Sequence, residues 1–234
     1  MSTGNAGVIK ENIEKIKMRV AHAAQKSGRK PEDVKIIAVT KTVDTARITE
    51  AIEAGITDVG ENRVQELCNK YDIIGARCNW HLIGSLQTNK VKYIIDKVAL
   101  IHSLDRIELA EEIQKRAERI SRIVDVLVQV NVAREETKSG IYLEQAYDFV
   151  KEISKYGNIR VRGLMTIAPF AENPEEVRFV FKELHKLYID IGKENADNIN
   201  MDYLSMGMSN DFEVAIEEGS NMVRIGTAIF GRRY

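Results

Sequence analysis

The stretch Ile36-Ile37-Ala38-Val39-Thr40-Lys41 joins an apolar strand to a basic residue at its carboxyl end. A short, continuous apolar run of this kind is typical of a strand buried in a parallel sheet. Lysine is among the residues least often buried, so a lysine placed here lies at the rim of a packed core. Desolvation at such a rim favours the neutral, nucleophilic amine that Schiff-base chemistry requires. The alternative is a solvated lysine that merely ends the strand, and the other strand ends bear on the choice.

The same pattern, a short apolar strand followed by a helical stripe, recurs along the chain. Ile107, Ala110, Ile113 and Ala117, for example, lie on one face of a helix. The expected strands are residues 34–39, 58–62, 80–84, 98–101, 123–130, 159–165, 203–206 and 222–225. Eight strands alternating with helices are the signature of a (β/α)₈ TIM barrel, an α/β fold. We expect Val91, Ile94 and Ile95 to mark the helix after strand three, and Phe212 to Glu218 to form a short helix after strand seven.

The organisation beyond the barrel follows from length and from the first segment. With 234 residues, the chain is close to the roughly 250 residues of a single α/β barrel, so we expect one domain over residues 1–234. Ile9, Ile13, Ile16 and Val20 predict an amphipathic helix to about Lys26. Residues 1–30 would then form a helical extension that covers one end of the barrel. An open doubly wound sheet is the alternative, but its first crossover is usually rich in glycine, and residues 40–44 contain none.

Composition excludes several classes of function. The formal net charge of −1 gives no electrostatic case for nucleic acid or an acidic membrane surface. Cys68 and Cys78 are too few for a disulfide framework and lack zinc spacing, so we predict no metal site and a reducing compartment. Residues 1–5 have no signal-peptide pattern, and no apolar run approaches the roughly 20 residues that span a bilayer. We therefore expect a cytoplasmic protein.

Polar or small residues follow most of the apolar strands. In a barrel of this type the active site lies at the carboxyl ends of the strands. The residues expected there are Lys41, Glu61-Asn62-Arg63, His81, Gly84-Ser85, His102-Ser103, Asn131, Met165-Thr166, Ser205-Met206-Gly207-Met208-Ser209 and Arg224-Ile225-Gly226-Thr227. Charged and amide groups in a half-buried mouth need partners, and a polar ligand would supply them.

The loops after strands seven and eight predict a phosphate site, because barrels of this type commonly bind phosphate there. Ser209 is the expected N-cap of the helix after strand seven, and Gly226-Thr227 follow strand eight. Glycine allows close backbone approach, and free N–H groups at a helix start favour an anion. The alternative is that Ser209 only caps a helix and Gly226 only turns a corner.

Arg224 completes the prediction of a ligand. A nucleophilic lysine on strand one and a phosphate cradle on strands seven and eight imply a ligand with an aldehyde and a phosphate, and pyridoxal 5′-phosphate fits. Its pyridine nitrogen would then face Arg224. Aminotransferase-type sites place an acid there to keep that nitrogen protonated, whereas an arginine disfavours protonation. Such a site should stabilise carbanions weakly.

Several longer motifs resemble one family. They are Ala38-Val39-Thr40-Lys41, Gly60-Glu61-Asn62, the run from Trp80 to Lys90, Gly163-Leu164-Met165, the run from Ser205 to Ser209, and Arg224-Ile225-Gly226-Thr227. In this order they resemble the pyridoxal-phosphate homeostasis proteins, single-barrel proteins similar to the N-terminal domain of bacterial alanine racemase. The resemblance implies that Lys41 forms the internal aldimine with the cofactor and that Arg224 faces the pyridine nitrogen. It also implies that Ser209, Gly226 and Thr227 hold the phosphate, while Asn62, His81 and Met165 line the pocket.

We expect a protein that carries or buffers the cofactor, with cofactor-dependent apo-enzymes as its partners, and a monomer is expected. The alternative is an amino-acid racemase or a related cofactor-dependent enzyme. A two-base racemase needs acid/base groups on both faces of the substrate carbon. Lys41 could serve one face, but His81 and Tyr203, the candidates for the other, are expected to be scaffold residues. A phosphosugar aldolase that uses Lys41 without a cofactor is a weaker third hypothesis.

Overall fold

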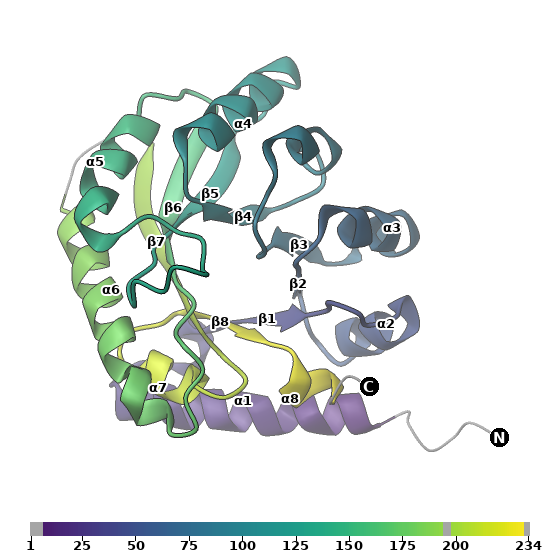
Figure 1. The fold of residues 1–234 in the computed structure, drawn as a ribbon. Helices are drawn as coiled ribbons and strands as arrows, with labels where there is room; N and C mark the ends of the chain where they lie inside the picture. Colours follow the sequence, from purple (N-terminus) through teal and green to yellow (C-terminus); the bar gives the residue numbers. More distant parts are fainter. Residues whose placement is uncertain (1–6, 194–197, 232–234) are drawn as a thin grey trace.

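The computed structural model describes residues 7–193 and 198–231, and these form a closed parallel barrel with helices outside it (Figure 1). The strands pair in chain order, and β1 closes the ring by pairing with β8. They are β1 (Lys35–Val39), β2 (Asp58–Glu61), β3 (Asn79–Leu82), β4 (Leu100–Leu104), β5 (Val124–Gln129), β6 (Ile159–Met165), β7 (Ile199–Met208) and β8 (Met222–Ile225). The predicted (β/α)₈ barrel is confirmed.

Eight α-helices accompany the strands in the described part of the chain. They are α1 (Val8–Lys26), α2 (Thr45–Glu53), α3 (Val64–Ile74), α4 (Ile107–Arg119), α5 (Leu143–Ile153), α6 (Arg178–Ile191), α7 (Phe212–Glu217) and α8 (Thr227–Phe230). Asp44 shows why one of them begins where it does, because its side chain accepts a hydrogen bond from the backbone N–H of Arg47 and so caps α2. No helix within the described ranges is both long and apolar enough to cross a membrane.

The segment between β3 and β4 differs from the prediction. The expected helix around Val91 and Ile94 is a 3₁₀ helix over Thr88–Tyr93. Both apolar side chains are nevertheless fully buried. Three apolar residues within five positions span little more than one turn, and one turn of either helix type buries them. The stripe therefore located the buried face correctly but did not determine the helix type.

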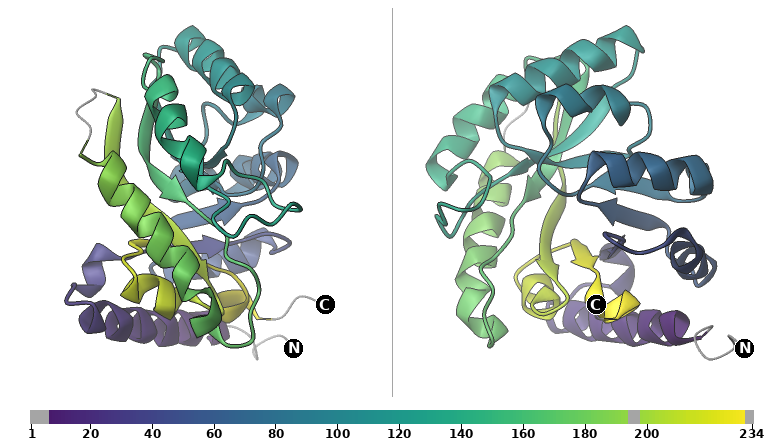
Figure 2. Two further views of the ribbon diagram at one scale, coloured as in Figure 1. Left: turned by 60° about the vertical axis from the view of Figure 1, so that its left-hand side comes forward. Right: turned by 45° about the vertical axis from the view of Figure 1, so that its right-hand side comes forward.

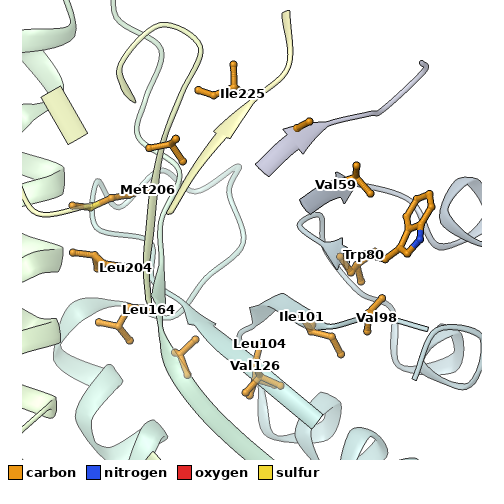
Figure 3. Packing of buried hydrophobic residues seen from close by; sticks show 14 of the residues in the cluster. Val59, Trp80, Val98, Ile101, Leu104, Val126, Leu164, Leu204, Met206 and Ile225 are labelled. Carbon is orange, nitrogen blue, oxygen red and sulfur yellow. The ribbon is translucent and has the colours of Figure 1, made fainter. Parts of the chain in front are cut away.

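Two apolar clusters alternate across the strands. The larger lies between the sheet and the surrounding helices, and Figure 3 shows part of it, with Val59, Trp80 and Ile101 on the strands. The smaller fills the interior of the barrel and contains Ile37, Leu100, Leu127, Met165 and Met222. Side chains alternate between the two faces of each strand, which is why one sheet supplies both clusters. Met165, expected to line a ligand pocket, belongs to the inner cluster and has no exposed surface.

Helix α1 is present over the predicted residues, but its place is different. It packs against α7, α8 and α2 on the outside of the barrel, and it does not cover a barrel end (Figures 1 and 2). Asn12 donates a hydrogen bond of 2.9 Å to the carbonyl oxygen of Ile229, at the end of α8. The apolar stripe gives the helix a buried face, but it does not say whether other helices or strand ends receive that face.

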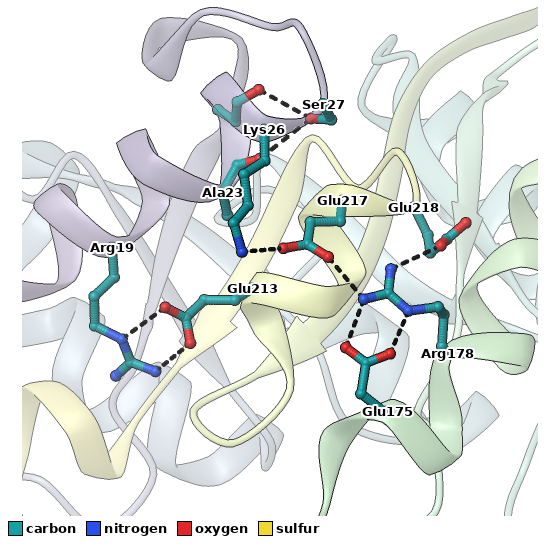
Figure 4. A network of polar contacts seen from close by, with 10 residues as sticks. Arg19, Ala23, Lys26, Ser27, Glu175, Arg178, Glu213, Glu217 and Glu218 are labelled. Carbon is teal, nitrogen blue, oxygen red and sulfur yellow. Dashed lines mark hydrogen bonds and ion pairs between the residues drawn. The ribbon is translucent and has the colours of Figure 1, made fainter.

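Ion pairs connect α1 to α7 and α7 to α6 (Figure 4). Arg19 pairs with Glu213 at 2.7 Å, and Lys26 pairs with Glu217 at 3.1 Å. Glu217 is also bound at 2.7 Å by Arg178, which begins α6. Because these side chains range from partly to largely exposed, the ion pairs contribute little to stability. We expect the network mainly to fix the relative positions of the three helices.

Candidate functional site

A cavity of about 310 Å³ opens at the carboxyl ends of β1, β2, β7 and β8. Its lining comprises Val39, Lys41, Asn62, Ile83, Ile167, Met208, Ser209, Asn210, Arg224, Gly226 and Thr227. Lys41, Asn62, Ser209, Arg224, Gly226 and Thr227 were predicted as site residues, and the fold brings them together from strands at opposite ends of the sequence. Two larger hollows, of about 490 and 480 Å³, lie along α1 and near the amino ends of β1 and β2, away from these residues. We place the site at the strand carboxyl ends, where barrels of this type carry their chemistry.

Lys41 lies two residues beyond β1 and is half-buried. Within the described ranges its ammonium group makes no hydrogen bond or ion pair, so it is available to a ligand in the cavity. The next residue, Thr42, has a φ of 61°, which is unusual for a β-branched residue. Its N–H donates a 2.6 Å hydrogen bond to the carboxylate of Glu66 on α3, and this bond supports the strained turn directly after the lysine.

Thr40, the residue before Lys41, belongs to a buried ionic cluster. The ammonium of Lys70 donates to the carbonyl oxygen of Thr40 at 2.7 Å, to Glu61 at 2.6 Å and to Glu66 at 2.7 Å. The hydroxyl of Thr40 also donates to Glu61 at 2.6 Å. The residues before and after Lys41 are thus both fixed to groups on β2 and α3. Sequence reasoning missed Lys70, although a lysine four residues after Glu66 on a helix is a recognisable ion-pair pattern.

The two carboxyl groups of this cluster respond differently to their surroundings. Burial raises the pKa of Glu61, and the hydrogen bonds from Lys70 and Thr40 offset this only in part. Burial also acts to raise the pKa of Glu66, but there the hydrogen bonds from Lys70 and from the Thr42 N–H prevail, and the pKa is lowered. The more exposed Glu66 is therefore the firmer anionic partner of Lys70.

Ser209 has a different role from the one predicted. Helix α7 begins at Phe212 with Asp211 at its N-cap position, so the prediction that Ser209 caps this helix was wrong. The hydroxyl oxygen of Ser209 instead accepts hydrogen bonds from the backbone N–H groups of Gly226, at 3.2 Å, and Ala228, at 3.4 Å. It therefore joins the loop after β7 to the loop after β8, the two loops predicted to form an anion cradle.

Gly207 allows this loop to reach its position. Its φ is 92°, and a Cβ at residue 207 would lie 2.7 Å from the Cβ of Ala215 and 2.8 Å from the Cα of Phe212. Only glycine tolerates both the backbone conformation and the contact with α7. Two residues further on, Ser209 lines the cavity, and α7 begins only at Phe212.

Arg224 is only 3% exposed and lies at the wall of the cavity. Its Nη1 donates to the hydroxyl of Ser205 at 2.6 Å, and its Nη2 donates to the carbonyl oxygen of Thr166 at 2.7 Å. Burial lowers the pKa of Arg224 to about 10, so the guanidinium still carries its charge at neutral pH. The interpretation of Arg224 as a fixed cation at the strand ends agrees with this geometry.

His81 does not line the cavity. It is buried inside the barrel, where its ring nitrogens lie 2.9 Å from an oxygen of Asp58 and 3.0 Å from a nitrogen of His102. Burial lowers the pKa of His81 although Asp58 opposes the effect, and it lowers the pKa of His102 well below the usual value. Both imidazoles are therefore neutral. Met165 does not line the cavity either, because it packs in the inner apolar cluster.

The charged side chains that line the cavity all have the same sign. Its charged groups are the cations Lys41 and Arg224, and its other polar side chains are amides and hydroxyls. Among the lining residues within the described ranges there is no aspartate, glutamate, histidine or tyrosine. Such a set binds an anion and offers one amine for covalent attachment, but it offers no second proton-transfer group opposite Lys41. Met208 belongs to the run expected after strand seven, whereas Asn210, Ile83 and Ile167 were not predicted as site residues.

Comparisons with known proteins agree with one another. Residues 9–233 match the family model described as "Alanine racemase, N-terminal domain". The pyridoxal phosphate homeostasis protein of Aquifex aeolicus is 46% identical over 224 residues, which is 95% of this chain and 97% of that protein. A protein from Bifidobacterium adolescentis, described as unknown, has a crystal structure with a TM-score of 0.90 and 36% identity, covering 98% and 97% of the two chains. PipY of Synechococcus elongatus, solved with pyridoxal phosphate bound, has a TM-score of 0.82 and 30% identity, covering 95% of this chain and 100% of PipY.

Proposed function

Since this chain belongs to the family of pyridoxal phosphate homeostasis proteins, we propose that it binds pyridoxal 5′-phosphate reversibly and takes part in keeping the cofactor available inside the cell. One observation carries the proposal. The amine of Lys41, which has no partner among residues 7–193 and 198–231, shares a cavity with Arg224 and with the Ser209–Gly226 junction of the two carboxyl-terminal loops. The relative PipY, which was solved with this cofactor bound, supports it.

The residues present fit the cofactor. A volume of about 310 Å³ lies within the range of small-molecule sites. An anionic phosphate suits a lining whose only charged side chains, in the described ranges, are cationic. The side chains of Ile83 and Ile167 provide apolar surface for an aromatic ring.

Each polar residue then has a definite task. When bound, the cofactor supplies an aldehyde carbon for covalent attachment and a ring that withdraws electrons. Lys41 provides the nucleophilic nitrogen, and Thr40 and Thr42 hold its backbone. Ser209, Gly226 and Thr227 would hold the phosphate, while Arg224 would face the ring nitrogen and place a positive charge there. Asn62 lies at the cavity wall and can orient the ring substituents.

The lining favours a carrier over a racemase. A second acid/base group would have to reach the face of the substrate carbon opposite Lys41. His81 is enclosed within the barrel, and Tyr203 packs beside the inner apolar cluster under the guanidinium of Arg162, 5.2 Å from the ring centroid. Neither lines the cavity. With an arginine at the ring nitrogen as well, we propose that the protein holds the cofactor more than it uses it.

An absorption and trapping experiment tests the proposal. We expect the purified protein with added pyridoxal phosphate to show a visible band that borohydride bleaches, with the reduced cofactor found by mass spectrometry on the peptide that contains Lys41. Lys41→Ala should lack both the band and the modified peptide, whereas Lys10→Ala, an exposed residue of α1, should retain them. Wild-type protein without a band at saturating cofactor would refute the proposal.

A second experiment separates the carrier from the enzyme. Amino acids incubated with loaded protein in deuterium oxide should exchange their α-hydrogen no faster than with free cofactor. Exchange at enzymatic rates that disappears in Lys41→Ala would support the racemase alternative instead.

We further propose that the protein acts in the cytoplasm as a monomer and passes its cofactor to apo-enzymes that need it. The free thiols of Cys68 and Cys78 suit a reducing compartment. Incubating loaded protein with a cofactor-dependent apo-enzyme, behind a dialysis membrane or in direct mixture, distinguishes transfer by contact from release into solution.

A further inference from the structure

Arg224 presents an energetic difficulty. It is a buried cation, yet within the described ranges no carboxylate lies at ion-pair distance from its guanidinium. A buried charge without a partner is costly, and proteins normally compensate for it with direct pairing or full hydrogen bonding. Asp211 lies near enough to favour the charge electrostatically, but its carboxylate bonds to the backbone N–H of Met208. The compensation for Arg224 must therefore come largely through the groups to which it donates.

One of those groups begins a chain of buried hydrogen bonds. Ser205 accepts from Arg224 at 2.6 Å, and its hydroxyl lies 3.1 Å from Nδ1 of His102. Nε2 of His102 lies 3.0 Å from Nδ1 of His81, and Nε2 of His81 lies 2.9 Å from Oδ1 of Asp58. The chain starts on β8 at the cavity and ends on the first residue of β2. Because β4 and β7 are not neighbours, the bond between His102 and Ser205 crosses the interior of the barrel.

The two ends of the chain fix the position of every proton in it. A carboxylate only accepts, so His81 carries a proton on Nε2 and donates it to Asp58. His81 is neutral, so its Nδ1 accepts from Nε2–H of His102. His102 is also neutral, so its Nδ1 accepts from the hydroxyl of Ser205, whose oxygen in turn accepts from Arg224. All four bonds therefore point from the cation to the anion.

The anionic end is firmly held. Asp58 also accepts hydrogen bonds from Lys35 at 3.2 Å, from Thr57 at 2.7 Å and from Asn79 at 3.2 Å. Burial acts to raise the pKa of Asp58, but the hydrogen bonds from His81 and Thr57 prevail and hold the pKa well below its usual value. At neutral pH the carboxylate of Asp58 is therefore ionised and the guanidinium of Arg224 is protonated.

We propose that Ser205, His102 and His81 are positioning residues for Arg224: they connect its guanidinium to the carboxylate of Asp58 through aligned neutral dipoles and so hold a buried cation at the cavity wall. Aligned hydrogen bonds polarise one another in a medium of low dielectric constant. The bond to Ser205 and the bond to the Thr166 carbonyl together fix both Nη atoms against the barrel interior. The remaining N–H groups of the guanidinium are then presented to the cavity in one orientation.

The consequence for cofactor affinity rests on the proposed function, but the proton positions do not. Nitrogen-15 NMR of the imidazoles in protein free of cofactor should show, at pH 7, neutral rings protonated on Nε2 in both His81 and His102. Assignment uses His81→Gln and His102→Gln. A proton on Nδ1, or a doubly protonated ring, at either residue would overturn the proposal whether or not the protein binds the cofactor.

Two buried serines give a matched pair of variants. Ser205→Ala removes the link between Arg224 and His102, whereas Ser103→Ala removes a hydroxyl on β4 that is equally buried but has no hydrogen-bond partner in the described part of the chain. We expect Ser205→Ala to shift the Nδ1 resonance of His102 and to weaken pyridoxal phosphate binding about tenfold, the size of a lost hydrogen bond to a charged group. Ser103→Ala should change neither.

The outcomes separate positioning from general stability. Equal losses of affinity in both variants, or an unchanged His102 resonance in folded Ser205→Ala, would overturn the proposal. Should Ser205→Ala not fold, we expect Ser205→Thr, which retains the hydroxyl, to restore both the fold and the His102 resonance. The proton positions of His81 and His102 in the wild-type protein would then test the proposal without the alanine variant. If wild-type protein bound no cofactor, the proposed function would fail while the NMR measurement would still test the chain.

Discussion

The ammonium of Lys70 lies 2.6 Å from a carboxylate oxygen of Glu61, and neither side chain is more than 9% exposed. Removing one partner of such a pair leaves the other charge buried and uncompensated. We expect Lys70→Met to lower the free energy of unfolding by about 3 kcal/mol, a typical loss when one partner of a buried pair is removed. Urea unfolding followed by circular dichroism measures it.

The double variant Lys70→Met/Glu61→Gln provides the control, because it removes both charges. It should recover a large part of the lost stability. A loss below about 1 kcal/mol in the single variant would mean that the pair behaves as an exposed one. Because Lys70 also donates to the carbonyl oxygen of Thr40, we expect the single variant to bind pyridoxal phosphate more weakly as well.

Gly84 tests how tightly the cavity wall is packed. A Cβ at this residue would lie 2.3 Å from the carbonyl oxygen of Asn62, so Gly84→Ala must displace the loop that carries Asn62. We expect a loss of about 2 kcal/mol or more in unfolding free energy, comparable with other overpacked sites. Gly157→Ala is the matched control, since nothing lies within 4 Å of its Cβ. Equal stabilities of the two variants would contradict this account of Gly84.

Stability should depend on pH through the two buried histidines. Burial holds the pKa of His81 and His102 below the ordinary value of about 6.5 in the folded protein. Below pH 6.5 the unfolded chain therefore binds more protons, and the free energy of unfolding falls with the pH, by up to about 1.4 kcal/mol per pH unit for each histidine. Urea unfolding between pH 7.5 and 4.5 measures this slope.

His102→Gln has one fewer titrating imidazole, so its slope in this range should be about half as steep. An identical slope in wild type and variant would exclude His102 as a source of acid lability. Asp58 acts at lower pH, because its pKa is depressed in the folded state. Its stabilisation is present above about pH 4 and is lost as the pH falls through the folded-state value.

Ser209 should distinguish phosphate binding from ring binding. Its hydroxyl oxygen accepts from the N–H groups of Gly226 and Ala228 and so joins the two loops that are proposed to hold the phosphate. We expect Ser209→Ala to weaken binding of pyridoxal phosphate about tenfold and to leave binding of pyridoxal, which has no phosphate, unchanged. Fluorescence or absorption titration with both ligands gives the comparison. A parallel loss for pyridoxal would assign Ser209 to a general structural role.

The barrel was predictable from sequence because its strands are short apolar runs and its helices have clear stripes. The positions of Lys41, Arg224 and Gly226 followed, since the carboxyl ends of the strands of a parallel barrel meet at one face. Ser209 shows a limit of the method. Ser209 and Asp211 are both good N-cap residues, so the residue types alone do not decide which of them precedes α7, and in the structure it is Asp211.

The buried chain marks a second limit. The sequence placed His81 and His102 near the carboxyl ends of apolar strands, whereas both lie within β3 and β4, and whether they face a ligand or each other depends on strand stagger. The register shifts between β4 and β5 and between β7 and β8. Alternation along one strand gives the face on which a residue lies, not its height in the barrel. Consequently, no pattern in one segment could place His102 opposite Ser205.

The pairing of β1 with β8 determines at which stage of folding the ligand can bind. Lys41 follows the first strand of the barrel and Arg224 lies on the last, so the two ends of the cavity come from segments far apart in the sequence. A compound that must touch both can bind only after the ring has closed. Its binding energy then stabilises the closed form alone. Occupancy of the site would in this way report closure of the ring, since a partly folded chain in which β1 and β8 are unpaired has no complete site to fill.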